Sequence, residues 1–291
     1  MNFNKIALGA VQFGMDYGIS NDSGQTPIHE ISRILSLANT LGISLIDTAI
    51  SYGSSEKNLG EVGVSSFNIV SKLPSGALKN RQPKGIILEH IKESLIRLNK
   101  KSLYGFLSHN ASDLLSLNGE KIYKVLIEAK QNGLINKIGA SVYHPDEITQ
   151  LMNYYDLDII QAPFNIIDDR LIKSGLMRDL YKSNVEIHVR SIFLQGLLIM
   201  DPSVRLLRFK KWKNLWNNWE EWLNDLKVTP IEACLSYAHS FEEISKVIIG
   251  VETEQQLKEI SNLKLLKFIN IPDKLKIDDQ LLINPVNWIN P

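Results

Sequence analysis

Residues 43–61 read ISLIDTAISYGSSEKNLGE, and this stretch contains the unit from which most of the chain is built. Its short apolar run is followed by a polar turn and then by an amphipathic segment. Such runs are typical of strands buried on both faces of a parallel sheet, and an amphipathic segment after the strand is typical of a crossover helix. The stretch therefore predicts one strand-helix unit of an α/β fold.

The same pattern of an apolar run, a polar turn and an amphipathic segment recurs along the chain. The predicted strands are Ile6–Leu8, Ser44–Ile46, Asn68–Ser71, Tyr104–Leu107, Lys137–Gly139, Ile159–Gln161, Glu186–Val189 and Val247–Ile249. No Pro/Gly/Ser-rich linker interrupts the series. Eight strands that alternate with helices predict an α/β fold of the (β/α)8 TIM-barrel type rather than an open sheet. We expect residues 1–291 to form a single domain of this kind.

Two Thr-Pro pairs mark predicted helix starts. Thr26 and Thr229 are each followed by a proline and then by apolar residues at helical spacing. Threonine is a favoured N-cap, and proline is favoured in the first helical position. We expect both threonines to cap the helices that follow them.

Two segments depart from the repeat. Residues 201–227 form an insertion after the seventh strand, with tryptophans at helical spacing: Trp212, Trp216, Trp219 and Trp222. We expect a helix that packs this tryptophan stripe onto the barrel; an element that covers the substrate or forms a dimer is the alternative. Residues 270–291 are expected to be an irregular tail over the barrel surface or mouth.

Composition narrows the classes of partner. Lys+Arg and Asp+Glu number 32 each, so no net charge favours nucleic acid or an anionic membrane. The single Cys234 lies between apolar residues and predicts a buried thiol in an intracellular protein. The N-terminus has no secretory pattern, no apolar run is long enough to span a bilayer, and the histidine spacing indicates no metal site. These features predict a cytoplasmic protein, either a monomer or a weak homo-oligomer.

Ionisable residues follow three successive predicted strands. Asp47 and Tyr52 come after the second strand, Lys72 after the third and His109 after the fourth. Each has an ordinary structural explanation when taken alone, such as a loop cap, packing or a solvated charge. In a (β/α)8 barrel, however, the carboxyl ends of the strands face one mouth. We therefore expect these four side chains to form one site.

The four residue types suit carbonyl reduction. The alkoxide that forms when hydride reaches the carbonyl carbon needs a proton, and a free phenol with a pKa near 10 is a poor donor at neutral pH. Lys72 would lower the pKa of Tyr52 by stabilising the phenolate, and Asp47 would hold Lys72 charged. A neutral His109 would donate a hydrogen bond to the carbonyl oxygen.

The chain resembles the aldo-keto reductase superfamily from Leu8 to about Glu259. The resemblance is carried, in family order, by LGAVQFG at 8–14, Asp47-Thr48-Ala49, Tyr52-Gly53, Ser55-Glu56, Leu59-Gly60, Ser71-Lys72, Ser108-His109-Asn110, IGAS at 138–141, QAPFN at 161–165 and VIIG at 247–250. It implies that Asp47, Tyr52, Lys72 and His109 are catalytic, with Tyr52 the general acid in reduction and the general base in oxidation. It also implies that NADP(H) or NAD(H), and no metal, serves as cofactor, bound without a Rossmann glycine fingerprint.

The resemblance further implies a set of cofactor contacts. Ser141 and Gln161 match positions that bond the nicotinamide carboxamide, although Val142 replaces a frequent asparagine. Arg190 matches a residue that stacks on the nicotinamide, and Glu252 stands where typical members bind the adenosine 2′-phosphate with basic residues. The choice between NADPH and NADH is therefore left open. The full set of implied contacts is Gly9, Asp47, Ser141, Gln161, Arg190, Ser191, Leu194, Gly196, Gly250, Glu252, Gln256 and Glu259.

The expected function is reduction of a carbonyl, or oxidation of a hydroxyl, on a small polar aldehyde, ketone or sugar derivative. One alternative is a nicotinamide-binding regulatory or redox-sensing protein with little turnover, against which the complete set of four residues argues. A second is a barrel lyase that forms a Schiff base through Lys72. No residue near the predicted mouth is recognisable from the sequence as a clamp for a phosphate or carboxylate.

Overall fold

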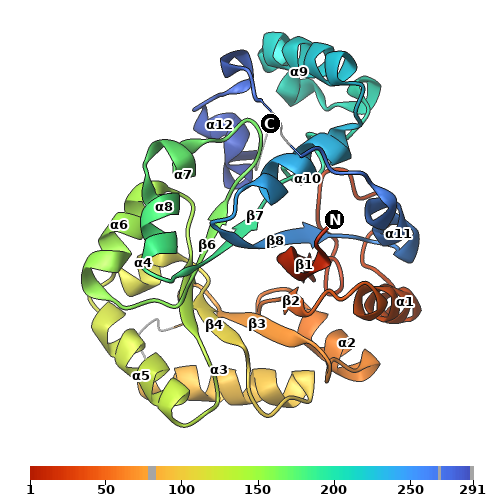
Figure 1. Cartoon of the computed structure of the whole chain (residues 1–291). Helices are drawn as coiled ribbons and strands as arrows, with labels where there is room; N and C mark the ends of the chain where they lie inside the picture. The colour runs from red at the N-terminus through yellow and green to blue at the C-terminus, as the bar shows by residue number, and fades with distance from the viewer. Residues whose placement is uncertain (78–82, 268–269, 289–291) are drawn as a thin grey trace.

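The computed structural model describes residues 1–77, 83–267 and 270–288. Eight parallel strands close into a barrel in chain order (Figure 1). The strands are β1 (Ile6–Gly9), β2 (Leu45–Asp47), β3 (Asn68–Leu73), β4 (Gly105–Ser108), β5 (Ile138–Ser141), β6 (Ile159–Pro163), β7 (Glu186–Arg190) and β8 (Ile244–Gly250). The (β/α)8 prediction is confirmed.

All eight strands extend one or two residues beyond the predicted carboxyl ends. The added positions include the polar residues Asp47, Lys72, Ser141 and Arg190. Polar residues at the end of an apolar run suggest a loop, yet here the backbone of each remains paired with the neighbouring strand. The strand continues because its polar side chain is accommodated at the barrel mouth, where it has polar partners.

Helices surround the barrel and bury their apolar faces against it (Figure 1). They are α1 (Ile28–Thr40), α2 (Ser55–Val62), α3 (Pro83–Leu98), α4 (Ala111–Leu114), α5 (Gly119–Gln131), α6 (Pro145–Tyr154), α7 (Arg170–Lys173), α8 (Leu176–Lys182), α9 (Lys213–Leu226), α10 (Pro230–Ser240), α11 (Glu254–Asn262) and α12 (Gln280–Ile283). A separate apolar cluster includes Ala7, Leu45, Val70, Leu107, Ile159 and Ile248 from six of the strands. Because these side chains fill the interior of the barrel, an active site is expected at its carboxyl-terminal mouth.

One of the two predicted helix caps is correct. Thr229 caps α10 with its hydroxyl, and Glu232 completes a capping box. The prediction for Thr26 is wrong, because Pro27 has an extended backbone and α1 begins at Ile28. The Thr26 amide instead donates to the Gln12 carbonyl, and its buried hydroxyl has no protein partner among the described residues. The extended proline places Thr26 outside the reach of the first helical turn.

The tryptophan stripe was predicted to pack onto the barrel, and its hydrogen bonds instead join it to the loop after β7, to the insertion itself and to the tail. Trp216, Trp219 and Trp222 of α9 are buried, and the Trp219 indole donates to the Leu198 carbonyl at 3.2 Å. The tail is more regular than expected, since it contains α12 and the 3-10 helix η5 (Pro285–Trp288). Residues 268–269 and 289–291 lie outside the described part. Insertion and tail meet at one end of the molecule, where the Trp212 indole donates to the Asp279 carboxylate at 3.0 Å (Figure 1).

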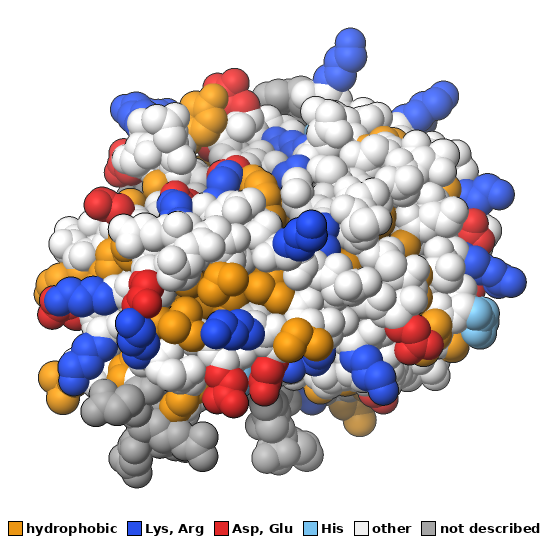
Figure 2. All heavy atoms as spheres, turned by 90° about the horizontal axis from the view of Figure 1, so that it is seen from below, with side chains coloured by type: hydrophobic (Ala, Val, Ile, Leu, Met, Phe, Trp, Pro, Cys, Tyr) orange, Lys and Arg blue, Asp and Glu red, His pale blue; other side chains and the backbone are white. Residues whose placement is uncertain are grey.

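The structure also bears on the predictions made from the composition of the chain. Cys234 is buried, as predicted, and burial raises the pKa of its thiol. On the face that Figure 2 shows, Lys and Arg side chains are interspersed with Asp and Glu. Across the described ranges no helix is both long and apolar enough to cross a membrane. The same residues contain no cluster of three or more potential metal ligands.

Candidate active site

The four predicted catalytic residues meet at the carboxyl-terminal mouth of the barrel. Lys72 Nζ lies 2.7 Å from Asp47 Oδ2, 2.8 Å from the Thr48 carbonyl oxygen and 3.5 Å from Tyr52 Oη. The Tyr52 ring meets the His109 ring edge-on, with 5.6 Å between centroids. Lys72 is completely buried, so its charge depends on these oxygen partners.

Burial controls the electrostatics of this group. Burial, and after it the Asp47 charge, raises the pKa of Tyr52, while Arg190 acts in the opposite direction. Burial likewise lowers the pKa of Lys72 against the opposing effect of Asp47. The sequence-based expectation that Lys72 lowers the Tyr52 pKa therefore does not describe this structure, because it ignored desolvation and the adjacent carboxylate. Tyr52 is held as a neutral phenol.

His109 is held neutral. Burial, followed by the positive charge of Lys72, lowers the pKa of His109 to about 4. Its Nδ1 lies 3.3 Å from the Ser51 hydroxyl. If Ser51 donates to Nδ1, the ring proton is on Nε2, and the imidazole can donate from that atom.

The turn that carries Tyr52 is fixed by a close backbone approach. Gly53 has a positive φ of 55°, and a Cβ there would overlap the Gly14 carbonyl. Conversely, a Cβ at Gly14 would overlap the Tyr52 carbonyl oxygen and the Ser55 amide. Ser55 Oγ also donates to the Ala10 carbonyl at 2.7 Å. The loop after β1 therefore supports the tyrosine turn directly.

Behind this turn, helix α2 is held by a buried carboxylate. Glu56 accepts hydrogen bonds from Ser71 Oγ at 2.6 Å, Ser94 Oγ at 3.2 Å and Arg97 Nε at 2.8 Å. Burying a carboxylate is tolerated because Arg97 balances its charge. The Ser55-Glu56 motif thus serves to position the tyrosine turn on the barrel.

We expect Gly14→Ala to reduce kcat by roughly 10- to 100-fold, because the added methyl must displace the Tyr52 turn and misplacing a reacting group carries a cost of this size. Binding of NADH, measured by fluorescence titration, should change far less. Gly85→Ala is the matched control, since a Cβ at Gly85 has open space in α3. Equal kcat values for Gly14→Ala and Gly85→Ala would contradict this role of Gly14.

The residues predicted to bind the nicotinamide are also at the mouth. Gln161 Nε2 donates to Asp47 Oδ1 at 2.7 Å, and Ser141 pairs with Gln161 in the register of β5 and β6. The Val142 side chain is buried, but its carbonyl accepts a hydrogen bond from Arg190 at 2.8 Å. The Arg190 guanidinium lies 4.5 Å from the centroid of the Tyr143 ring. Arg190 is therefore held in a fixed orientation over the mouth.

The loop after β7 has an unusual backbone. Ser191, Leu194 and Gln195 have positive φ angles of 61°, 50° and 52°, and such conformations are rare outside glycine. The Leu194 side chain is completely buried, so only its backbone can face a ligand. A Cβ at Gly196 would overlap the Ser20 side chain. This loop thus lies against the loop after β1, and strain of this kind is often found at binding sites.

The predicted adenosine end is acidic. Gly9 and Gly250 are paired across β1 and β8. Beyond them, the Glu252 amide donates to Gln256 Oε1 at 2.7 Å, while Glu259 is exposed and accepts from Gln255. Burial raises the pKa of Glu252, and the negative charges of Asp22 and Asp16 add to this effect. Three carboxylates, those of Glu252, Asp22 and Asp16, therefore lie close together in the region that the sequence predicted to bind the adenosine end of the cofactor.

A cavity of about 600 Å³ opens at the mouth. Its lining comes from separated segments of the chain: Tyr17, Ile19, Tyr143, Arg190, Ser191, Gln195, Arg208, Pro285, Val286 and Trp288. Only two of these, Arg190 and Ser191, were predicted from the sequence. The others lie in loops, in the insertion and in the tail, where no periodic pattern indicates what faces the site.

The residues at the mouth fit a dinucleotide. The cavity has the size of an organic cofactor and substrate site. Close by, Gln12 Oε1 is buried without a hydrogen-bond partner among the described residues, and the Gln12 amide group fills the space beside Gly250. A buried polar atom without a partner is expected to bond a ligand or water. We therefore add Gln12 to the candidate cofactor contacts that the sequence did not indicate.

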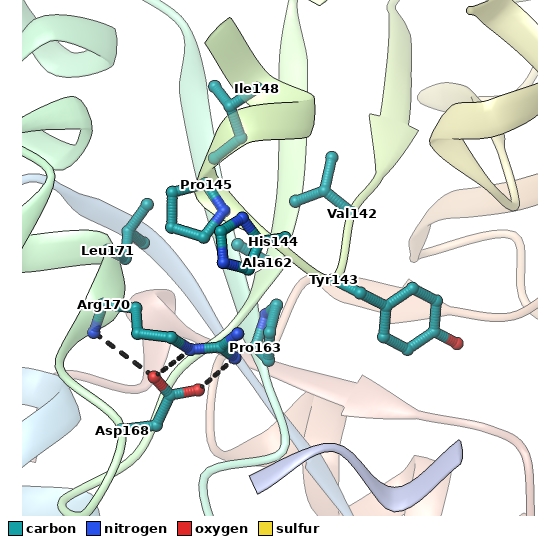
Figure 3. Close-up of a pocket in the computed structure, with 10 residues that line it drawn as sticks. All are labelled: Val142, Tyr143, His144, Pro145, Ile148, Ala162, Pro163, Asp168, Arg170 and Leu171. Carbon is teal, nitrogen blue, oxygen red and sulfur yellow. Dashed lines mark hydrogen bonds and ion pairs between the residues drawn. The ribbon is translucent and has the colours of Figure 1, made fainter. Parts of the chain in front are cut away.

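A second hollow lies to the side of the mouth, between the start of α6 and the start of α7 (Figure 3). Arg170 and Asp168 form a two-point ion pair there, at 2.8 Å and 2.7 Å. The Tyr143 ring extends away from this group (Figure 3). The hollow encloses about 10 Å³, enough for a single water, and so it does not compete with the mouth as a substrate site.

A (β/α)8 barrel with a buried Lys-Asp pair, a phenol and an imidazole at its carboxyl-terminal mouth has the arrangement of a barrel oxidoreductase. The sequence model of the aldo/keto reductase family matches residues 5–274. This chain therefore belongs to the aldo/keto reductase family, as its motifs indicated.

Solved structures share the fold of this chain, and one curated relative is similar to part of its sequence. The chain is similar to the holo form of aldo-keto reductase AKR11C1 from Bacillus halodurans, with a TM-score of 0.70 and 20% identity over 90% of this chain and 88% of that one. Glycerol dehydrogenase AKR11B4 from Gluconobacter oxydans gives a TM-score of 0.67 at 21% identity, over 90% and 88%. NADH-specific methylglyoxal reductase from Escherichia coli (strain K12) is 30% identical over 189 residues, or 55% of this chain and 56% of that protein. The match thus spans about half of this relative's length.

Proposed function

We propose that this protein is an NADH-preferring carbonyl reductase in which Tyr52 donates the proton to the substrate oxygen. The observation that carries this proposal is the position of Lys72 Nζ at the barrel mouth. It lies 2.7 Å from Asp47 Oδ2 and 3.5 Å from Tyr52 Oη. Membership of the aldo/keto reductase family supports chemistry on carbonyls or alcohols. The roles of the individual side chains are inferred from their geometry.

The protein's own groups would provide the proton and the orientation. Ser141, Gln161 and Arg190 would hold a dihydronicotinamide at the mouth, which would supply hydride to the carbonyl carbon while the carbonyl π pair became a lone pair on oxygen. Tyr52 Oη gives its proton to this oxygen and becomes a phenolate. Lys72 Nζ stabilises the phenolate until solvent returns a proton, and Asp47 keeps Lys72 charged. His109, if protonated on Nε2, donates to the carbonyl oxygen and aligns it with Tyr52.

The electrostatics favour reduction as the direction of catalysis near neutral pH. Because burial raises the pKa of Tyr52, the resting residue is the protonated phenol. A protonated phenol is ready to donate, whereas oxidation of an alcohol requires its prior deprotonation. We therefore expect carbonyls to be better substrates than alcohols under these conditions.

The mouth disfavours the two alternative functions. A Schiff base needs a lysine nitrogen that can reach a carbonyl carbon, but Lys72 Nζ is fully buried and surrounded by three oxygen partners. A sensor that only binds nucleotide does not need a buried ion pair beside a tyrosine. Multiple turnovers of NADH oxidation with any simple aldehyde would separate the reductase from both alternatives.

Preference for NADH is supported by the acidic adenosine end. Glu252, Asp22 and Asp16 would repel a 2′-phosphate, whereas a carboxylate can accept a hydrogen bond from a free ribose hydroxyl. The curated relative is NADH-specific and reduces methylglyoxal, which makes methylglyoxal the first substrate to test. Small sugar aldehydes are the next class to test.

We expect NADH to bind more tightly than NADPH, and Glu252→Gln to raise kcat/KM for NADPH by roughly 10-fold through loss of charge repulsion. Fluorescence titration with each nucleotide, followed by rates with methylglyoxal, measures both quantities. Glu89→Gln in α3 is the control for loss of an exposed carboxylate elsewhere. Failure of both nucleotides to bind would disprove the proposed function, and tighter binding of NADPH would disprove the preference alone.

A further inference from the structure

The charged side chains that line the mouth cavity are all cationic. Only Arg190 and Arg208 among its 10 lining residues carry a formal charge, and both are guanidinium groups. The carboxylate of the neighbouring Asp47 is already paired with Lys72. Within the described part of the chain, neither arginine forms an ion pair with a carboxylate. The cavity therefore presents positive charge without its own counter-charge.

The two arginines differ in how they are engaged. Arg190 is held at the end of β7 by the Val142 carbonyl and stacks on Tyr143. Arg208 comes from the 3-10 helix η3 (Leu207–Trp212) of the insertion, and it donates from one nitrogen to the Trp288 carbonyl at 3.0 Å. A guanidinium has five N–H donors. The described residues engage only one nitrogen of Arg208, so most of its donors are free for a ligand.

The backbone that carries Arg208 is firmly held. The neighbouring Phe209 is 1% exposed and meets Trp288 edge-on at 4.9 Å between ring centroids. The Phe209 carbonyl accepts from the Trp216 indole at 2.8 Å, and the Trp288 indole donates to the Leu282 carbonyl at 3.0 Å. Insertion and tail thus lock each other in place over the mouth. Arg208 is therefore presented by a fixed support rather than by a free loop.

We propose that Arg208 binds an anionic group, a carboxylate or a phosphate, at the far end of the carbonyl substrate. This inference rests on the proposed reductase function and narrows its substrate class. A planar guanidinium with free donors matches the two oxygens of such a group, and a neutral aldehyde would leave these donors unused. This site could not be predicted from the sequence, because Arg208 reaches the mouth only when insertion and tail pack together.

The first test compares matched substrates that differ in charge. With NADH and the wild-type protein, we expect kcat/KM for succinic semialdehyde to exceed that for butanal by at least roughly 10-fold, the usual effect of a charge-assisted hydrogen bond. A second pair, glyceraldehyde 3-phosphate and glyceraldehyde, distinguishes phosphate from carboxylate. The pair with the larger ratio identifies the preferred anion. Ratios near one in both pairs would overturn the proposal.

The second test uses Arg208→Gln, with Lys210→Gln as its matched control. Lys210 is an exposed cation in the same 3-10 helix that does not line the cavity. We expect Arg208→Gln to reduce the anionic-to-neutral ratio of kcat/KM by roughly 10- to 100-fold. Lys210→Gln should leave this ratio within about twofold, since screened surface charge has only a small effect. An unchanged ratio in Arg208→Gln, or an equal fall in Lys210→Gln, would contradict a specific site.

These two tests distinguish loss of the anion site from structural damage and from failure of the proposed reductase function. Glutamine is shorter than arginine and removes the bond to the Trp288 carbonyl, but any loosening of the tail that follows would lower kcat/KM for butanal and succinic semialdehyde together. A fall common to both substrates therefore counts against an anion site. If no aldehyde is reduced with either nucleotide, the proposed function fails; if each neutral aldehyde is reduced as well as its anionic partner, only the inference about Arg208 fails.

Discussion

Tyr52→Phe is expected to lower kcat for aldehyde reduction by about 1,000-fold, within the range that a positioned acid contributes. The substitution removes only the hydroxyl that lies 3.5 Å from Lys72 Nζ. Phenylalanine keeps the ring that packs edge-on against His109, so the shape of the mouth should persist. Steady-state rates with methylglyoxal and NADH measure the effect.

Nucleotide binding distinguishes this loss from misfolding. The dissociation constant for NADH should stay within about threefold of wild type, because the phenol proton is needed for chemistry rather than for the nucleotide's bound state. Tyr123→Phe in α5 is a matched control, since it removes a surface hydroxyl whose one partner among the described residues is the Asp156 carbonyl. Retention of full activity in Tyr52→Phe would remove the assignment of Tyr52 as proton donor.

Lys72→Met is expected to reduce both activity and stability. Methionine fills a similar volume but leaves the Asp47 carboxylate at the mouth without its cation, and loss of one partner of a buried pair costs about 3–5 kcal/mol of unfolding free energy. Activity should fall by at least roughly 100-fold, because the ammonium group that lies 3.5 Å from Tyr52 Oη and stabilises its phenolate is then missing. Urea unfolding at pH 7 and steady-state rates measure the two effects.

A double variant separates the two effects. In Asp47→Asn/Lys72→Met no charge remains unpaired, so much of the lost stability should return, while the rate should remain low. Gln161 can still bond the residue at position 47, which preserves part of the local structure. Recovery of catalysis together with stability in the double variant would show that Lys72 has a purely structural role.

The barrel was predictable because its signal is local and repeated. Each strand is a short apolar run beside an amphipathic helix, and a chain with eight such units closes in only a few ways. The incorrect predictions concerned the ends of strands and the start of one helix. Asp47, Lys72 and Arg190 were expected to follow strands but belong to them, since polar partners at the mouth replace the solvent that a loop would offer. Thr26 failed as a cap because the extended Pro27 separates it from the helix.

The grouping of Asp47, Tyr52, Lys72 and His109 was determined by the sequence itself. Residues that follow successive parallel strands must emerge at the same mouth, so order along the chain became proximity in space. Only the tertiary structure determined the rest of the site. Arg208 and Trp288 come from segments without periodic patterns, and they reach one cavity because Trp212 of the insertion bonds Asp279 of the tail and Phe209 packs on the buried Trp288. Tyr143 reaches the same cavity from the loop after β5. Such contacts depend on long-range packing, which no local pattern of residues records.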